Sequence, residues 1–126
     1  MTKREETVHA AIQVRDLAYC PYSKHAVGAA VLGEDDKIYS ACNVENASYG
    51  LTICAERNAI GTMLSNGCKK WKMIAVASPK GAFPCGACLQ VLQEFASENA
   101  AVILVDSDRK ISTFSLSELL PHPFSP

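Results

Sequence analysis

Three cysteines and one glutamate have the types and spacing of a metal site with a proton-transferring group. Cys85 and Cys88 form a Cys-x-x-Cys pair, and Cys54 lies upstream with Glu56 two positions after it. Thiolates are soft ligands that suit Zn²⁺, and catalytic zinc sites usually keep three protein ligands and leave the fourth position to water. The set therefore predicts one catalytic Zn²⁺ per subunit, held by the three cysteines. Glu56 is expected to move protons without being a ligand.

A structural zinc site with four ligands is the alternative interpretation of this pattern. Cys20, Cys42, Cys68 or a histidine would then have to be the fourth ligand. None of these residues has the spacing of a second ligand pair. Cys20, Cys42 and Cys68 are better explained as ordinary small residues that are buried or half-buried. A Cys-x-x-Cys pair taken alone would also fit a redox motif.

Each cysteine segment is expected to open a helix, which favours the charge state that a metal ligand needs. The N-terminus of a helix carries partial positive charge and stabilises a thiolate relative to a thiol. Three thiolates around one Zn²⁺ leave a net negative charge, which opposes the acidification of water at the metal. We expect Arg57 to offset this charge by donating to a ligand sulfur. The alternative is an arginine on a solvent-exposed helix surface.

Hydrophobic periodicity and turn residues predict the order α-β-β-α-β-α-β-β-α. Thr2 and Glu5 have the spacing of a capping box, Thr52 is a candidate cap for the second helix, and Pro84 suits the start of the third. Such alternation favours an α/β fold with a sheet covered by helices on both faces. The helices are expected over residues 2–19, 54–66, 84–97 and 115–120, and the strands over 27–32, 38–44, 72–78, 102–106 and 110–114.

Length and charge fit a single domain over residues 1–126 that acts on a small molecule. The net charge is −1, from 12 basic and 13 acidic residues, and no basic cluster stands out, which disfavours nucleic-acid binding. The first residues lack the apolar run of a signal peptide, and no stretch approaches the roughly 18 apolar residues of a membrane span. We therefore expect a cytoplasmic protein without membrane partners, whose six cysteines are metal ligands or buried thiols.

Residues 43–57 read Asn-Val-Glu-Asn-Ala-Ser-Tyr-Gly-Leu-Thr-Ile-Cys-Ala-Glu-Arg, and residues 84–88 read Pro-Cys-Gly-Ala-Cys, followed by Gln-Val-Leu at 90–92. Together these segments resemble the small cytidine deaminase family. Shorter matches begin at Tyr22 and end at Phe124, so the resemblance covers nearly the whole chain. The central motif is long and highly specific.

The resemblance implies a three-layer α/β/α fold around a five-stranded mixed sheet, and a homotetramer whose active sites are shared between subunits. It implies zinc-dependent hydrolysis of cytidine and deoxycytidine to uridine and deoxyuridine plus ammonia, a reaction of pyrimidine salvage. Glu56 matches the family's general base, which then acts as general acid. Ala47 and Tyr49 match residues that reach a neighbour's nucleoside, and Phe124 matches the aromatic residue that closes an adjacent subunit's pocket.

The resemblance also assigns contacts to the substrate. Asn43 and Glu45 match the residues that hold the ribose 3′-hydroxyl, and the backbone at Ala55 matches the group that binds the pyrimidine carbonyl. Asn43 and Glu45 alternate along an extended segment and can face one side, and an amide and a carboxylate suit a hydroxyl group. The alternative for both is a polar strand end with local turn bonds.

Three positions depart from the family pattern. His25 stands where a phenylalanine usually packs near the pyrimidine, as either a tolerated swap or a changed base preference. Leu89 stands where an arginine often follows the last cysteine, which removes a cation from beside the metal cluster. Phe83 stands where a small hydroxyl residue is common, and it either narrows the approach to the metal or packs against its loop.

Other functions remain open on the sequence alone. The same chemistry on a modified cytosine nucleoside or an aminopyrimidine antibiotic is the first alternative, because His25 and Phe83 leave the base side open. An RNA- or DNA-editing deaminase is a second, which the near-neutral charge disfavours. A non-catalytic zinc or nucleoside-binding module is a third, which the intact Glu56 disfavours.

Overall fold

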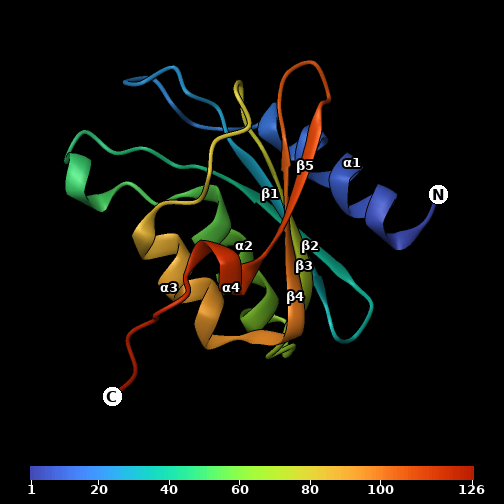
Figure 1. Cartoon of the computed structure of the whole chain (residues 1–126). Coiled ribbons are helices and arrows are strands. Elements are labelled where there is room, and N and C mark those ends of the chain that lie inside the picture. The colour runs from blue at the N-terminus through green and yellow to red at the C-terminus, as the bar shows by residue number, and fades with distance from the viewer.

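A five-stranded mixed sheet lies between one helix on one face and three helices on the other in the computed structural model, which describes residues 1–126 (Figure 1). The predicted three-layer α/β fold is confirmed. The helices are α1 (Lys3–Arg15), α2 (Ala55–Ser65), α3 (Gly86–Glu94) and α4 (Leu116–Leu119), with a short 3₁₀ turn η1 (Tyr49–Leu51). The strands are β1 (Gly28–Gly33), β2 (Ile38–Cys42), β3 (Trp71–Ala77), β4 (Ala96–Val105) and β5 (Ile111–Ser115).

The strand order is β2-β1-β3-β4-β5, and only the β3–β4 pair is parallel. A parallel pair needs a crossover connection, and α3 lies within the one that joins β3 to β4. The β1–β2 hairpin forms where the sequence predicts it, with Leu32 paired to Ile38 next to the turn. None of the helices is long and apolar enough to cross a membrane.

The core has two parts, one on each face of the sheet. On the side of α2, α3 and α4 it contains large buried side chains such as Trp71, Ile60 and Leu92. The Trp71 indole Nε1 donates to the Leu92 carbonyl at 2.9 Å and so ties β3 to α3. On the α1 side the buried residues are mostly small, which lets α1 approach β1 closely. Gly28 is required there because a Cβ at this position would lie 2.2 Å from the Ala11 carbonyl oxygen.

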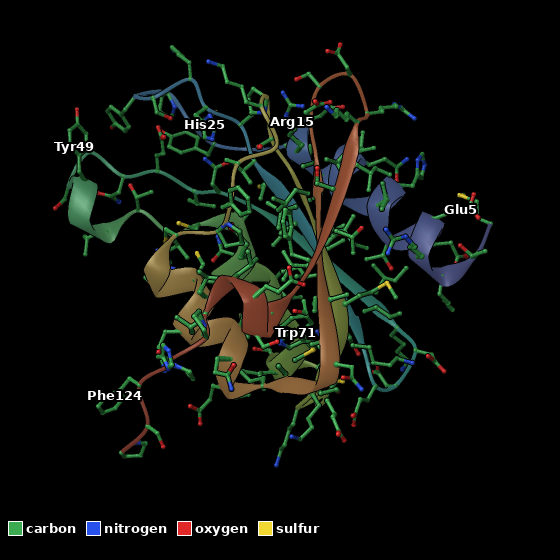
Figure 2. All side chains as sticks on the ribbon, viewed as in Figure 1. Glu5, Arg15, His25, Tyr49, Trp71 and Phe124 are labelled. Carbon is green, nitrogen blue, oxygen red and sulfur yellow. The ribbon has the colours of Figure 1, made fainter.

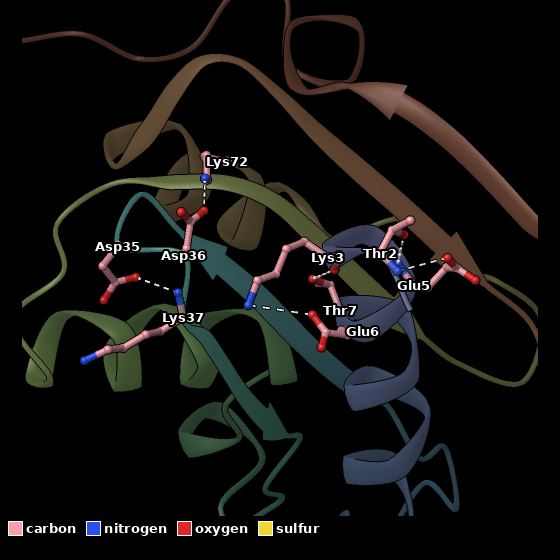
Figure 3. Close-up of polar contacts among 9 residues, drawn as sticks. All are labelled: Thr2, Lys3, Glu5, Glu6, Thr7, Asp35, Asp36, Lys37 and Lys72. Atoms are coloured by element: carbon pink, nitrogen blue, oxygen red, sulfur yellow. Dashed lines mark hydrogen bonds and ion pairs between the residues drawn. The ribbon is translucent and has the colours of Figure 1, made fainter.

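Polar contacts fix the first helix and the hairpin (Figure 3). The predicted capping box is present: Glu5 N–H donates to Thr2 Oγ1 at 3.1 Å, and Thr2 N–H donates to Glu5 Oε1 at 3.0 Å. In the β1–β2 turn, Asp36 forms an ion pair with Lys72 of β3. These contacts satisfy donors at a helix end and join the hairpin to its neighbouring strand.

The first helix ends at Arg15, and the prediction that it extends to residue 19 is wrong. Residues 16–18 continue in tight turns, with Leu17 N–H bonded to the Val14 carbonyl. Tyr19 is extended and pairs with Val44 in a parallel bridge. Tertiary pairing of Tyr19 therefore overrides the helical periodicity of the sequence.

The third helix ends at Glu94 rather than at residue 97, and the fourth strand begins at Ala96 rather than at 102. The reason is pairing with β3, because Trp71 N–H bonds to the Phe95 carbonyl and Trp71 lies opposite Ala96. The second predicted strand ends at Cys42 rather than 44. The cap of α2 is Cys54, not Thr52, whose hydroxyl accepts from Asn46 N–H at 3.2 Å instead.

Candidate metal centre and substrate cavity

The ends of β2 and β3 bring the two cysteine segments together. Gly28, at the start of β1, pairs with Cys42 on one side and with Ala77 on the other. Since β1 is antiparallel to both neighbours, β2 and β3 end at the same edge of the sheet. The segments that leave this edge lead into α2 and α3, which pack against each other on one face.

Three thiols converge where these helices begin. Cys54 is the N-cap of α2, Cys85 is the N-cap of α3, and Cys88 lies in the first turn of α3. All three Sγ atoms lie within 4.8 Å of one another, and Sγ of Cys85 is 3.5 Å from Sγ of Cys88. Neither N-cap cysteine makes a side-chain capping bond. At a Zn–S distance of about 2.3 Å, tetrahedral ligand sulfurs would be about 3.8 Å apart, so the three thiols fit Zn²⁺.

Arg57 supplies the positive charge beside the thiols. Its Nη2 donates to Cys54 Sγ at 3.3 Å, and its Nε is buried without an acceptor. The pKa of Cys54 is lowered, mainly by a hydrogen bond from Cys88 and further by Arg57. The pKa of Cys88 is raised, mainly because its thiol gives that hydrogen bond. The hydrogen bonds from Cys88 and Arg57 thus favour a thiolate at Cys54.

Glu56 is 5% exposed. It is the second residue of α2 and follows Cys54 by two positions. Burial is the largest cause that raises its pKa, to about 7, and the neighbouring Cys54 adds to the rise. Its own backbone N–H and Arg57 act in the opposite direction. A carboxyl group in this environment can both accept and release a proton near neutral pH.

A cavity of about 180 Å³ lies against the thiols and Glu56. Predicted site residues supply half of its lining: His25, Asn43, Cys54, Ala55, Glu56 and Cys85. Cys88 is fully buried and does not reach the cavity. Ala55 is the first residue of α2, and the N–H of such a residue has no partner within its helix. The cavity therefore combines two thiols of the candidate metal cluster, a buried carboxyl group and a free backbone donor.

Asn43 lines this cavity and also holds the loop before β1. Its Oδ1 accepts from Val27 N–H at 3.0 Å, and its Nδ2 donates to the His25 carbonyl at 2.9 Å. The amide keeps a second hydrogen on Nδ2 for another acceptor. His25 is thus carried into the cavity wall on a segment that Asn43 fixes.

Glu45 lies in an adjoining cavity of about 330 Å³. Its carboxylate accepts from Tyr22 N–H at 2.9 Å, Ser23 N–H at 3.2 Å and the Ser23 hydroxyl, and the Ser23 hydroxyl bond is the largest cause that lowers its pKa. Thr52 lines both cavities. Its sequence position predicted only a helix cap, and no sequence signal pointed to its place in the two cavity walls.

Three of the predicted site residues lie outside the first cavity and are exposed: Ala47, Tyr49 and Phe124. Tyr49 is 72% exposed on η1, where its ring meets Tyr22 edge-on at 5.7 Å, and it lines the cavity of Glu45. Phe124 is 75% exposed near the C-terminus and lines neither cavity. Figure 2 shows Tyr49 and Phe124 at separate edges of the molecule.

The three departures from the family pattern have distinct surroundings. His25 and Phe83 line the first cavity, and the Phe83 ring also lies 5.1 Å from that of Phe114. Leu89 is partly buried against the core between the helices and the sheet. Ser78 is a lining residue that the sequence analysis missed; its Oγ accepts from Ala82 N–H at 2.8 Å and fixes the loop that leads to Cys85.

Known proteins that are similar to this chain are described as cytidine deaminases. Residues 1–108 match the family described as the cytidine and deoxycytidylate deaminase zinc-binding region. A cytidine deaminase of Sporosarcina psychrophila is 42% identical over 123 residues, 96% of this chain and 90% of that protein. A probable cytidine deaminase of Dictyostelium discoideum is 46% identical over 124 residues, 96% and 83% of the two chains. The crystal structure of a Burkholderia pseudomallei cytidine deaminase is similar with a TM-score of 0.92 and 40% identity, covering 98% of this chain and 100% of that one.

Proposed function

The chain belongs to the cytidine and deoxycytidylate deaminase family. We propose that it hydrolyses the 4-amino group of cytidine and deoxycytidine, and that residues 1–126 form the single domain that does so. The products are uridine or deoxyuridine and ammonia. The observation that carries the proposal is the buried Glu56 in the wall of the cavity that also contains Cys54 and Cys85.

Cys54, Cys85 and Cys88 are the residues that would hold Zn²⁺. Their sulfurs all lie within 4.8 Å of one another, which supports a single ion. When bound, zinc supplies a Lewis acid that lowers the pKa of water and so makes a nucleophile available near neutral pH. Arg57 offsets the negative charge of the thiolates through its bond to Cys54 Sγ.

Glu56 moves the protons of the reaction. Its carboxylate takes a proton from the attacking water and delivers it to N3 of the pyrimidine, while the water oxygen adds to C4. Glu56 then takes the second proton of the former water from the hydroxyl on C4 and transfers it to the 4-amino group. The C4–N bond breaks, C4 becomes a carbonyl carbon and ammonia leaves. The burial of Glu56 supports this role, because it brings the pKa of the carboxyl group close to neutral pH.

The remaining contacts orient the nucleoside. The free backbone N–H of Ala55 is suited to donate to the pyrimidine carbonyl, and His25 lies in the wall of the same cavity. Asn43 and Glu45 already bind the backbone of the loop before β1. The second Nδ2 hydrogen of Asn43 and the remaining lone pairs of the Glu45 carboxylate bind the ribose 3′-hydroxyl. Thr52 lines the cavity of Glu56 and the cavity of Glu45, which supports placing base and sugar side by side.

The enzyme acts as a homotetramer with shared active sites, in the cytoplasm. The exposed Ala47, Tyr49 and Phe124 contact the nucleoside of a neighbouring subunit, and the 72% and 75% exposure of the two aromatic rings supports their burial by another copy. The six free cysteines support a reducing compartment.

The test is ultraviolet absorbance of cytidine and deoxycytidine with zinc-loaded protein, alongside ammonia release. We expect conversion of both nucleosides, loss of conversion when a chelator removes zinc, and recovery when zinc is restored. A protein that holds stoichiometric zinc and converts neither nucleoside would contradict the proposed substrate while leaving the metal site in place.

A further inference from the structure

The last six residues, Pro121–Pro126, form a tail with no regular structure. Three of the six are prolines, which have no N–H to donate. Five of the residues are exposed and Pro123 is half-buried. The tail follows α4 and runs along the side of α3 to the C-terminus (Figure 1). No helix or strand pairing holds this tail against the rest of the protein.

Gln90 supplies the missing attachment. Phe124 N–H donates to Gln90 Oε1 at 3.1 Å, and Gln90 Nε2 donates to the Phe124 carbonyl at 3.2 Å. These are the only hydrogen bonds that residues 121–126 make. One side-chain amide thus pairs with both the donor and the acceptor of one backbone residue, as a neighbouring strand would.

This clasp fixes the backbone of Phe124 and leaves its ring free. The ring is 75% exposed and takes no part in the cavity of its own chain. Gln90 follows Cys88 by two positions on α3, which turns the side chain by about 200° and directs it away from the metal cluster. Figure 2 accordingly shows Phe124 projecting outward, far from His25 in the cavity wall. A large apolar ring that is exposed on a fixed backbone is suited to pack against another protein molecule.

We propose that Gln90 is the positioning residue for Phe124, and that its amide clasp presents the ring to the substrate cavity of another copy of the chain. The inference rests on the proposed function, in which Phe124 closes a neighbour's cavity. The clasp holds the tail in one position before substrate binds, so the entropy cost of ordering the tail does not reduce the affinity for substrate. Because α3 also carries Cys85 and Cys88, the same helix holds the metal of one site and the closing ring of another.

The test uses Gln90→Ala in the zinc-loaded enzyme, with Gln93→Ala as matched control, since Gln93 lies on the same helix and makes no side-chain hydrogen bond. Loss of two neutral hydrogen bonds predicts a rise in KM for cytidine of about tenfold, with kcat and zinc content retained. Hydrogen–deuterium exchange of the C-terminal peptide should accelerate in Gln90→Ala and not in Gln93→Ala.

Two further variants test separately the length of the Gln90 side chain and its hydrogen-bonding groups. Gln90→Asn keeps both amide groups but is one methylene shorter, and it should behave like Gln90→Ala. Gln90→Glu keeps the length and can accept from Phe124 N–H, but it cannot donate to the Phe124 carbonyl, so its KM should lie between those of Gln90→Ala and the wild type.

A double-mutant cycle with Phe124→Ala completes the test. If Gln90 acts through Phe124, the double variant has the KM of Phe124→Ala alone. Additive effects, an unchanged KM or exchange rate in Gln90→Ala, or a Phe124→Ala variant with wild-type KM would each overturn the inference. Failure of the proposed function is a separate result, because it is seen in the wild-type enzyme as absence of deamination.

Discussion

At the scale of single residues, the proposed site assigns metal binding and proton transfer to different side chains. The thiols sit at or near helix N-termini, where partial positive charge and Arg57 favour thiolates. Glu56 belongs to the same helix as Cys54, but it is buried against the cavity. Each function can therefore be removed without removing the other.

Glu56→Gln should retain zinc and lose turnover. The amide keeps the size of the side chain but cannot accept and return a proton, and general acid–base groups contribute about 10²- to 10⁴-fold to rate. Ammonia release measures the loss, and metal analysis checks that zinc is still present. A variant with a near-normal rate would show that another group moves the protons.

Cys88→Ser should lose zinc, whereas Cys20→Ser should keep it. Cys88 lies within the thiol cluster, while Cys20 is a half-buried free thiol outside it. Loss of a ligand should lower zinc affinity by at least about 100-fold, since loss of a group that only supports a ligand typically costs 10–100-fold. Competition with a chelating dye measures the affinity. Equal affinities in the two variants would contradict the ligand assignment.

At the scale of elements, short polar contacts hold the segments that form the cavity wall. Asn43 and Glu45 lie beyond the end of β2, and both bind the backbone of the segment before β1. The β1–β2 turn has its own contact, in which Tyr39 Oη donates to Asp35 Oδ2 at 2.5 Å. The hairpin is therefore polar at its turn and fixed to the site at its other end.

The Asp35–Tyr39 contact predicts a pH dependence of stability. The hydrogen bond from Tyr39 lowers the pKa of Asp35, so the contribution of Asp35 to the free energy of unfolding is present above about pH 4 and is lost as pH falls through the folded-state pKa. The same bond raises the pKa of Tyr39 to about 12, so its contribution is lost as pH rises through that value. Asp35→Asn should flatten the acid side of the profile.

Urea unfolding at a series of pH values measures this effect. Tyr39→Phe is the companion variant, because it removes the donor and should flatten both the acid and the alkaline side. An acid limb in Asp35→Asn as steep as that of the wild type would show that other carboxyl groups account for it.

At the scale of the whole molecule, several large apolar side chains are exposed at the cavities and away from them. Phe83, Tyr22 and Tyr49 line the two cavities, whereas Phe124 lines neither. Surface of this kind marks interaction sites in soluble proteins. A short chain gains core by assembly, which fits the proposed homotetramer.

Shared active sites predict complementation between two defective variants. Glu56→Gln protomers retain Phe124, and Phe124→Ala protomers retain Glu56, so mixed tetramers contain cavities with both groups. Their KM for cytidine, measured on the residual activity, should fall below that of pure Phe124→Ala enzyme. Light scattering should give four times the 13.6 kDa chain mass for each assembly. A KM that does not change on mixing would show that each chain completes its own site.

The sequence by itself determined the chemistry and the order of elements. The spacing of Cys54, Cys85 and Cys88, with Glu56 beside the first, predicted the metal and the proton-transfer group, because ligand type and helix position are local properties. The capping box at Thr2 was likewise readable, since both partners lie within one turn.

Only the tertiary structure decided where elements end and how distant groups meet. Tyr19 and Ala96 were predicted to be helical but are extended, because strand pairing across the fold outweighs local periodicity. The two cavity walls that share Thr52, and the clasp between Gln90 and Phe124, bring together residues far apart in the chain, and no spacing rule connects such residues. Local propensity sets what a segment can be, and the pairing of strand edges, backbone groups and side chains across the fold decides which of those possibilities is realised.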